Sequence, residues 1–260
     1  WSVQLCPEPV EKLLEAGRVF LFLGGPEMGS HGTIFNAAWV LEGKRRDAQV
    51  GRELATAGDV NGDGYADIVV RTSPAWPNGN QISVFLGSEE GLASTAFWSF
   101  RENGIVASAG DVNGDGFGDV AAGNAVTGTA KLFLGRPSQE LAWFADESLS
   151  GNNSKLGVSV ASAGDVDADG FSDVVLGAPD YDAGTSRSGA AFVLKGSHDG
   201  MANSTIAMQR LLGCVQDNAQ FGFSAATAGD VNGDGFSDVI VGAPGCEQNR
   251  GSAFVYLGGS

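Results

Sequence analysis

Short apolar runs alternate with glycine-rich polar segments along most of the 260-residue chain. The runs are rich in β-branched and aromatic residues and end at Gly, Pro, Asn or Ser, which is typical of short β-strands. Ile68–Val70 and Ile82–Leu86 form one such pair of runs, and Val174–Leu176 and Ala190–Leu194 form another. Helical spacing of apolar residues is almost absent, and no run approaches the roughly 18 residues of a membrane-spanning helix. The pattern predicts an all-β fold with many tight turns.

Four copies of one acidic segment divide the chain into similar units. The copies begin at Asp59, Asp111, Asp165 and Asp230, and an apolar run follows each of them. Further runs lie before the acidic segment and after it, so that a unit holds four predicted strands. A four-stranded antiparallel unit that repeats along a chain is the blade of a β-propeller, which buries its faces against neighbouring blades.

We therefore predict a single β-propeller domain, or a fragment of one, over residues 1–260. Its expected parts are a partial blade, three blades and a blade that lacks its last strand, at residues 1–48, 49–101, 102–150, 151–213 and 214–260. The run at 17–25 matches the run at 251–259 closely, which indicates a chain that begins part-way through a blade. These units predict an incomplete or small ring, with open strand edges that tend to pair.

The acidic segments carry oxygen-bearing side chains at positions 1, 3, 5 and 9, and the backbone carbonyl at position 7 can add another oxygen. The predicted metal-binding residues are Asp59, Asn61, Asp63, Tyr65 and Asp67; Asp111, Asn113, Asp115, Phe117 and Asp119; Asp165, Asp167, Asp169, Phe171 and Asp173; and Asp230, Asn232, Asp234, Phe236 and Asp238. Glycine at position 6 permits a sharp turn that points alternate side chains at one centre. Oxygen-only ligation favours Ca²⁺ over Mg²⁺, and strongly over Zn²⁺. We predict about four Ca²⁺ sites, one in each loop.

Two other interpretations of these loops compete with the calcium site. An EF-hand needs a Glu at position 12 and flanking helices, but this position is apolar in every copy, such as Leu176 in the third. Asp-Gly and Asn-Gly pairs also mark hairpin turns that bind no metal. A turn alone does not require the aspartate at position 9, and four copies repeat the same carboxylates, which favours the metal site. The third loop has four acids and is expected to bind most tightly.

The motifs around the fourth loop resemble the FG-GAP repeat of the integrin α-subunit N-terminal β-propeller. They are Phe221-Gly222-Phe223-Ser224, the loop itself and Val241-Gly242-Ala243-Pro244. The third copy is similar, with Leu156-Gly157 and Gly177-Ala178-Pro179. The resemblance covers roughly residues 17–260. It implies calcium loops in hairpins at one face of a propeller, with ligand recognition by loops on the opposite face.

The first two copies depart from this pattern. The first has Gly51-Arg52-Glu53 in place of Phe-Gly-x-Ser, and Arg71-Thr72-Ser73-Pro74 in place of Gly-Ala-Pro. The second has Asn103-Gly104 and Gly123-Asn124-Ala125. Their acidic loops are intact, so we expect both copies to bind calcium. Because their FG and GAP motifs differ, we expect these blades to pack differently against their neighbours. Integrin propellers have seven blades, which again makes this chain resemble an arc of a ring.

Cys214 and Cys246 flank the fourth acidic loop, in predicted loops of one blade. We predict a disulfide between them, the alternative being two free thiols. Cys6 is left over, and its expected partner lies upstream of this chain. A disulfide and calcium loops together indicate an extracellular, cell-surface or periplasmic location.

Charge and motifs exclude several classes of function. A net charge of −16 disfavours nucleic acid, which needs clustered Lys and Arg. His31 and His198 lie apart in predicted loops, and no nucleophile elbow, phosphate-binding loop or zinc spacing occurs. The leading hypothesis is a non-catalytic extracellular module for adhesion or protein–protein interaction, with a protein or glycan ligand and no membrane insertion. The alternatives are a structural subunit that assembles through open blade edges or a ring completed by another chain, and an accessory or carbohydrate-binding propeller of a larger secreted enzyme.

Overall fold

The computed structural model describes residues 16–24, 37–44, 47–72, 80–102, 104–137, 142–148, 154–200 and 208–260. These residues form five antiparallel β-sheets and one short helical segment, α1 (Cys246–Asn249). The sheets are β1 (Arg18–Leu21) and β2 (Trp39–Glu42); β3 (Glu53–Gly58), β4 (Asp67–Thr72), β5 (Gln81–Phe85) and β6 (Trp98–Phe100); β7 (Ile105–Gly110), β8 (Asp119–Asn124), β9 (Thr129–Leu134) and β10 (Ala142–Ser148); β11 (Ser159–Gly164), β12 (Asp173–Ala178), β13 (Ala190–Leu194) and β14 (Met208–Leu211); and β15 (Ser224–Gly229), β16 (Asp238–Ala243) and β17 (Ser252–Tyr256). Among the described residues, no helix has the length and apolar character needed to cross a membrane.

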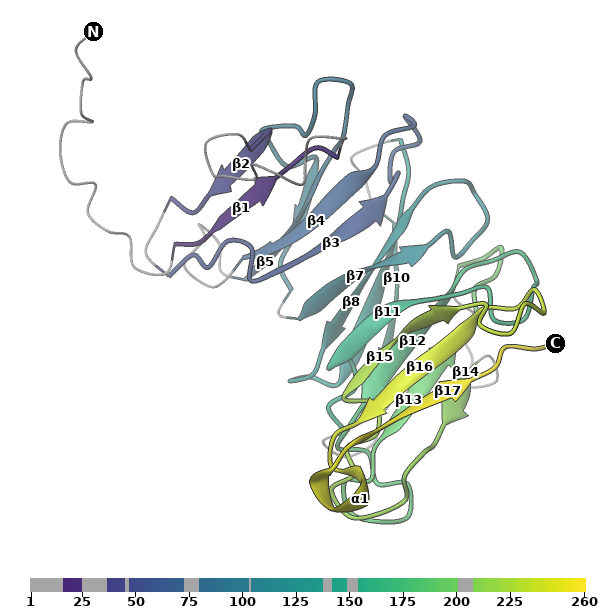
Figure 1. Cartoon of the computed structure of the whole chain (residues 1–260). Coiled ribbons are helices and arrows are strands. Elements are labelled where there is room, and N and C mark those ends of the chain that lie inside the picture. Colours follow the sequence, from purple (N-terminus) through teal and green to yellow (C-terminus); the bar gives the residue numbers. More distant parts are fainter. Residues whose placement is uncertain are drawn as a thin grey trace, which may run out of the picture.

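The sheets follow one another in chain order as an open arc, with β1 and β2 at one end and β15, β16 and β17 at the other (Figure 1). The first strands of successive four-stranded sheets lie in contact: β3 with β7, and β7 with β11, which in turn contacts β15. The described residues do not close a ring. The structure thus confirms the all-β class, the four-stranded antiparallel blades and the incomplete ring.

Apolar clusters fill the space between neighbouring sheets. Val69 and Ile82 pack with Val120 and Phe133 of the next sheet, for example. Because each blade buries its faces against its neighbours, the burial of a residue depends on the adjacent blade. Val166, directly after the first aspartate of the third loop, is 6% exposed. Its counterpart in the fourth loop, Val231, is 57% exposed, since no described sheet packs against that side.

Each acidic segment is the hairpin connection between the first and second strands of a sheet. The pairing shifts register at the same place in all four hairpins, just before the first aspartate of the loop; in the first hairpin the shift lies between Thr56 and Gly58. The glycine at this bulge has a positive φ in every copy, such as 76° at Gly58 and 70° at Gly229. A side chain would strain this left-handed conformation, which glycine adopts freely. The bulge turns the chain out of the first strand and into the loop.

Candidate metal centre

The four acidic loops occupy equivalent places in their sheets. In the first three loops the side chains at positions 1 and 3 are half-buried and that at position 5 is exposed. The fourth loop, in the last sheet, is more exposed. The aspartate at position 9 is fully buried in all four copies. Each loop therefore combines accessible carboxylates with one that lies inside the protein.

Hydrogen bonds curl each loop around its first aspartate. In the first loop, Asp59 Oδ1 accepts a bond from the backbone N–H of Gly62 (2.7 Å), and its Oδ2 accepts one from Gly64 (2.7 Å). Asn61 Nδ2 donates to Asp63 Oδ2 (2.9 Å). The second and fourth loops repeat all three bonds. The side chains at positions 1, 3 and 5 are thus brought together as the alternating spacing predicts.

A hydrogen bond within the loop fixes the backbone of the aromatic residue at position 7. In all four loops its N–H donates to the carboxylate at position 5, at 2.9 to 3.0 Å, from Tyr65, Phe117, Phe171 and Phe236. The proposed role of its carbonyl oxygen as a metal ligand stays a prediction.

The aspartate at position 9 ties the hairpin to the third strand of its sheet. Asp67 Oδ2 accepts a bond from Val60 N–H (2.8 Å), and Asp67 Oδ1 accepts one from Gly87 N–H (2.7 Å), just beyond β5. The other three copies make the same two bonds. Sequence reasoning took this aspartate as a sign of metal alone and missed the structural role. The signal was present, because a glycine follows the third predicted strand of every unit.

In the first three loops, burial makes the ionised form of the aspartate at position 9 costly. Removal from water raises the pKa of Asp119 to about 7, although bonds from two backbone N–H groups oppose the shift. The same cause raises the pKa of Asp173 to about 6 and the pKa of Asp67 above its usual value. The other carboxylates of the same loop repel the ionised form as well and raise these pKa values further. A bound cation would relieve both costs, and the oxygen-only donor set suits a hard divalent ion.

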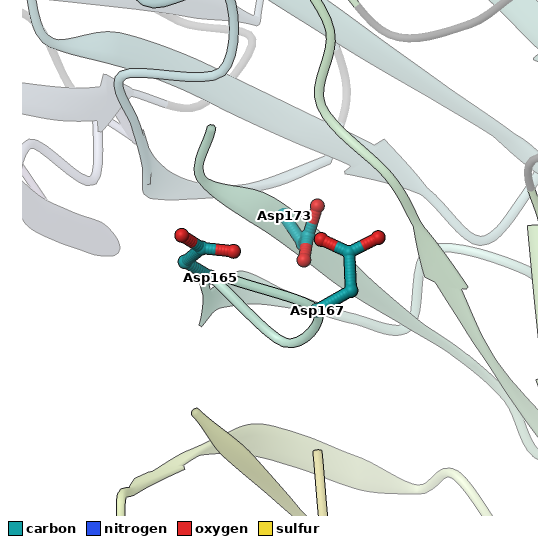
Figure 2. A group of neighbouring side chains, drawn as sticks. All are labelled: Asp165, Asp167 and Asp173. Atoms are coloured by element: carbon teal, nitrogen blue, oxygen red, sulfur yellow. The ribbon is translucent and has the colours of Figure 1, made fainter. Parts of the chain in front are cut away.

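Among the described residues, the third loop has an ion pair that the other loops do not have. Figure 2 shows Asp165, Asp167 and Asp173, which each offer an oxygen within 4.8 Å of the others. Asp167 Oδ2 accepts a hydrogen bond from Lys195 Nζ (2.6 Å), while Asp167 Oδ1 is buried without a hydrogen-bond partner. Sequence reasoning missed Lys195. The signal was a lysine where the equivalent residue of each other unit is leucine, at Leu86, Leu134 and Leu257.

Family models match the segments that carry these loops. The FG-GAP repeat model matches residues 156–194 and 221–256, and the FG-GAP-like repeat model matches residues 59–122. Between them the matched segments contain all four acidic loops. The chain belongs to the FG-GAP repeat proteins.

Integrin α subunits are similar to this FG-GAP protein over much of its length. Integrin alpha-5 of Xenopus laevis is 34% identical over 41% of the chain, and integrin alpha pat-2 of Caenorhabditis elegans is 32% identical over 60%. Integrin alpha-PS2 of Drosophila melanogaster is 26% identical over 78% of the chain. The matched parts span only 10%, 14% and 16% of these relatives.

The FG and GAP motifs meet at the seams between blades. Gly222 of one FG motif lies against Gly177 of the preceding GAP motif, where a Cβ on Gly177 would overlap the carbonyl oxygen of Gly222. Ser159 Oγ donates to that same carbonyl (3.1 Å). Arg71 stands in the first blade where Gly177 stands in the third, and it is buried, with 8% of its surface exposed. The first FG-GAP copy thus has a long, buried side chain at the position where the third copy has glycine.

The predicted disulfide between Cys214 and Cys246 is present. It joins the connection that leads into the last sheet to α1, which lies between β16 and β17. Gln216 Nε2 also donates to Gly245 O across the same two connections (2.8 Å). His198 is exposed, as the sequence predicts for a surface histidine. Cys6 and His31 lie outside the described residues.

Proposed function

We propose that this chain is a calcium-binding, non-catalytic FG-GAP propeller module that acts outside the cytoplasm in adhesion or protein–protein interaction. The observation that carries the proposal is the fourfold repeat of one loop with oxygen-bearing side chains at positions 1, 3, 5 and 9. In every copy the backbone N–H at position 6 donates to the aspartate at position 1, and the backbone N–H at position 7 donates to the carboxylate at position 5. These side chains and the carbonyl at position 7 are the proposed ligands. When bound, calcium would neutralise the loop carboxylates and so stiffen the hairpins.

The similarity to integrin α subunits supports an adhesive or protein-binding role. The disulfide supports an oxidising compartment, since such bonds persist mainly outside the reducing cytoplasm. We propose an extracellular, cell-surface or periplasmic location on these grounds.

The ligand-binding face that we propose lies opposite the acidic loops. Because the strands are antiparallel, the connections between second and third strands lie at the end of each blade away from those loops. The connection between β12 and β13 is braced by Asp180, which accepts hydrogen bonds from Arg187 and pairs with Lys155 (both 3.0 Å). Braced loops of this kind offer a preformed surface to a protein partner, or to a glycan.

Removal of calcium tests the metal sites directly. We expect the melting temperature of the chain, followed by circular dichroism, to be higher in millimolar calcium than in excess EDTA. A ligand that binds only the folded state at 100 times its Kd stabilises that state by about 2.7 kcal/mol for each site. Magnesium at the same concentration should stabilise less, because it requires a smaller octahedral shell.

Matched variants separate loop binding from general charge effects. Asp59→Asn removes a proposed ligand from the first loop, whereas Asp199→Asn removes a fully exposed acid outside the loops. The calcium-induced rise in melting temperature should shrink for Asp59→Asn and stay unchanged for Asp199→Asn. Equal melting temperatures of the unaltered chain in EDTA and in calcium would contradict the proposed function.

A further inference from the structure

We propose that Lys195 sets the cation affinity of the third acidic loop by placing a tethered positive charge on Asp167. This inference rests on the proposed calcium function and concerns one residue outside the ligand set. It removes the reason to expect that the loop with four acids binds most tightly.

The loop sequence explains why Asp167 needs a partner. In the other loops the residue at position 3 is asparagine, and its Nδ2 donates to the carboxylate at position 5 at 2.7 to 2.9 Å. Asp167 has no donor to offer Asp169, and the two carboxylates repel each other. Its Oδ2 instead accepts a bond from Lys195 Nζ at 2.6 Å. The pair is partly shielded from water, since the Asp167 side chain is only 14% exposed.

The backbone next to Lys195 holds the lysine beside the loop. Lys195 directly follows β13, and the next residue, Gly196, donates its N–H to Asp173 Oδ1 (2.8 Å). This bond anchors the end of β13 to the ligand set itself. The same bond occurs in the other three units, where the preceding residue is leucine. Every blade therefore holds a residue at this position beside its loop, and only in the third blade is that residue positively charged.

The lysine brings the third loop back to the charge of the others. Its four carboxylates carry −4, and Lys195 adds +1, which leaves −3. The first, second and fourth loops have three carboxylates each and also carry −3. A lysine ammonium repels an incoming Ca²⁺, and at about 5 Å in water the Coulomb repulsion between them lowers affinity roughly tenfold. Asp167 Oδ1 remains without a hydrogen-bond partner, so the carboxylate keeps an oxygen for the ion.

Site-resolved calcium titration tests the proposal. The backbone N–H of the glycine at position 6 donates to the first aspartate in every loop, so its NMR signal reports on its own loop: Gly64, Gly116, Gly170 and Gly235. We expect Lys195→Leu to shift the Gly170 midpoint to about tenfold lower calcium and to leave the other three unchanged. Lys195→Met, which keeps a long apolar stem, should do the same and serves if the leucine variant folds poorly.

A double-mutant cycle separates charge from shape. Asp167→Asn alone keeps Lys195 but leaves three carboxylates, so it should bind calcium most weakly. The double variant Asp167→Asn/Lys195→Leu recreates the composition of the other loops and should return to about the affinity of the unaltered third loop. A matched transplant is available in the fourth loop, where Leu257 is 60% exposed. Asn232→Asp should tighten that loop, and adding Leu257→Lys should reverse the gain.

The outcomes distinguish this inference from the proposed function. If all four glycine signals respond to calcium but the Gly170 midpoint is the same with lysine and with leucine at position 195, the role of Lys195 is wrong while the calcium sites stand. If none of the four signals responds, the calcium function itself fails, and the inference about Lys195 fails with it.

Discussion

Replacing Gly222 by alanine is expected to lower the free energy of unfolding by about 2 to 5 kcal/mol. Gly222 has a φ of 87°, where a side chain costs roughly 1 to 2 kcal/mol. An added Cβ would also overlap the carbonyl oxygen of Ala190 in the preceding blade, and overpacking of this kind costs about 1 to 3 kcal/mol. Urea denaturation followed by circular dichroism measures the loss.

Gly259→Ala is the matched control for this experiment. No atom lies within 4 Å of a Cβ built at Gly259, and its φ is not positive. The control should therefore unfold at nearly the same urea concentration as the unaltered chain. If Gly222→Ala were as stable as Gly259→Ala, the close contact between FG and GAP motifs would not hold the blades together. Because repeat units contact only their neighbours, the loss should be concentrated in the last two blades.

The strands and acidic loops could be predicted because their signals are local. Apolar runs such as Val174–Leu176 are bounded by turn residues within a few positions, and they form strands as expected. The curled shape of each loop depends on residues within nine positions of one another, so spacing alone indicates which side chains meet. The side chains at positions 1, 3 and 5 therefore lie together: in the first loop the backbone N–H of Asp63 donates to both Asp59 Oδ1 and Asn61 Oδ1, and Asn61 Nδ2 donates to Asp63 Oδ2.

The contacts that sequence reasoning missed join residues far apart in the chain. Lys195 reaches Asp167 from 28 positions away, and Gly87 bonds to Asp67 from 20 positions away. Both contacts require the third strand to be placed in register with the hairpin, and periodicity does not specify that register. The seam between Gly177 and Gly222 depends further on how one blade stacks on the next. A comparison of equivalent positions across the four units would have singled out Lys195, since the other units have leucine there.

Because the aspartate at position 9 has a structural role, its presence alone is weaker evidence for a metal site. Both oxygens of Asp67 accept backbone hydrogen bonds, so an aspartate there would be required even in a hairpin without metal. The stronger indication is electrostatic. A buried carboxylate such as Asp119, whose pKa burial raises to about 7, lies in a loop with two further acids. A divalent cation would stabilise such a loop more than it would stabilise a simple turn, because it offsets the repulsion between the carboxylates.

Removal of the disulfide is expected to destabilise the chain by about 3 to 4 kcal/mol, from the entropy of closing a loop of this length. Cys214 and Cys246 are 32 positions apart in the sequence, and the loop they close contains β15, the fourth acidic loop and β16. Without the bond the unfolded chain gains conformational entropy. In the folded state, the connection that enters the last sheet is no longer covalently linked to α1. Urea denaturation of Cys214→Ser/Cys246→Ser, with and without reductant, measures the change.

The reductant provides the internal control for this prediction. Reduced unaltered protein should unfold like the double serine variant, and the variant should not respond to reductant. If the variant unfolded at the same urea concentration as the oxidised chain, the last blade would be held by its seam alone. The fourth acidic loop lies inside the disulfide-closed segment, so the bond and calcium would restrict the same hairpin. Calcium should therefore stabilise the serine variant as well as the oxidised chain, because ligation requires only the folded loop.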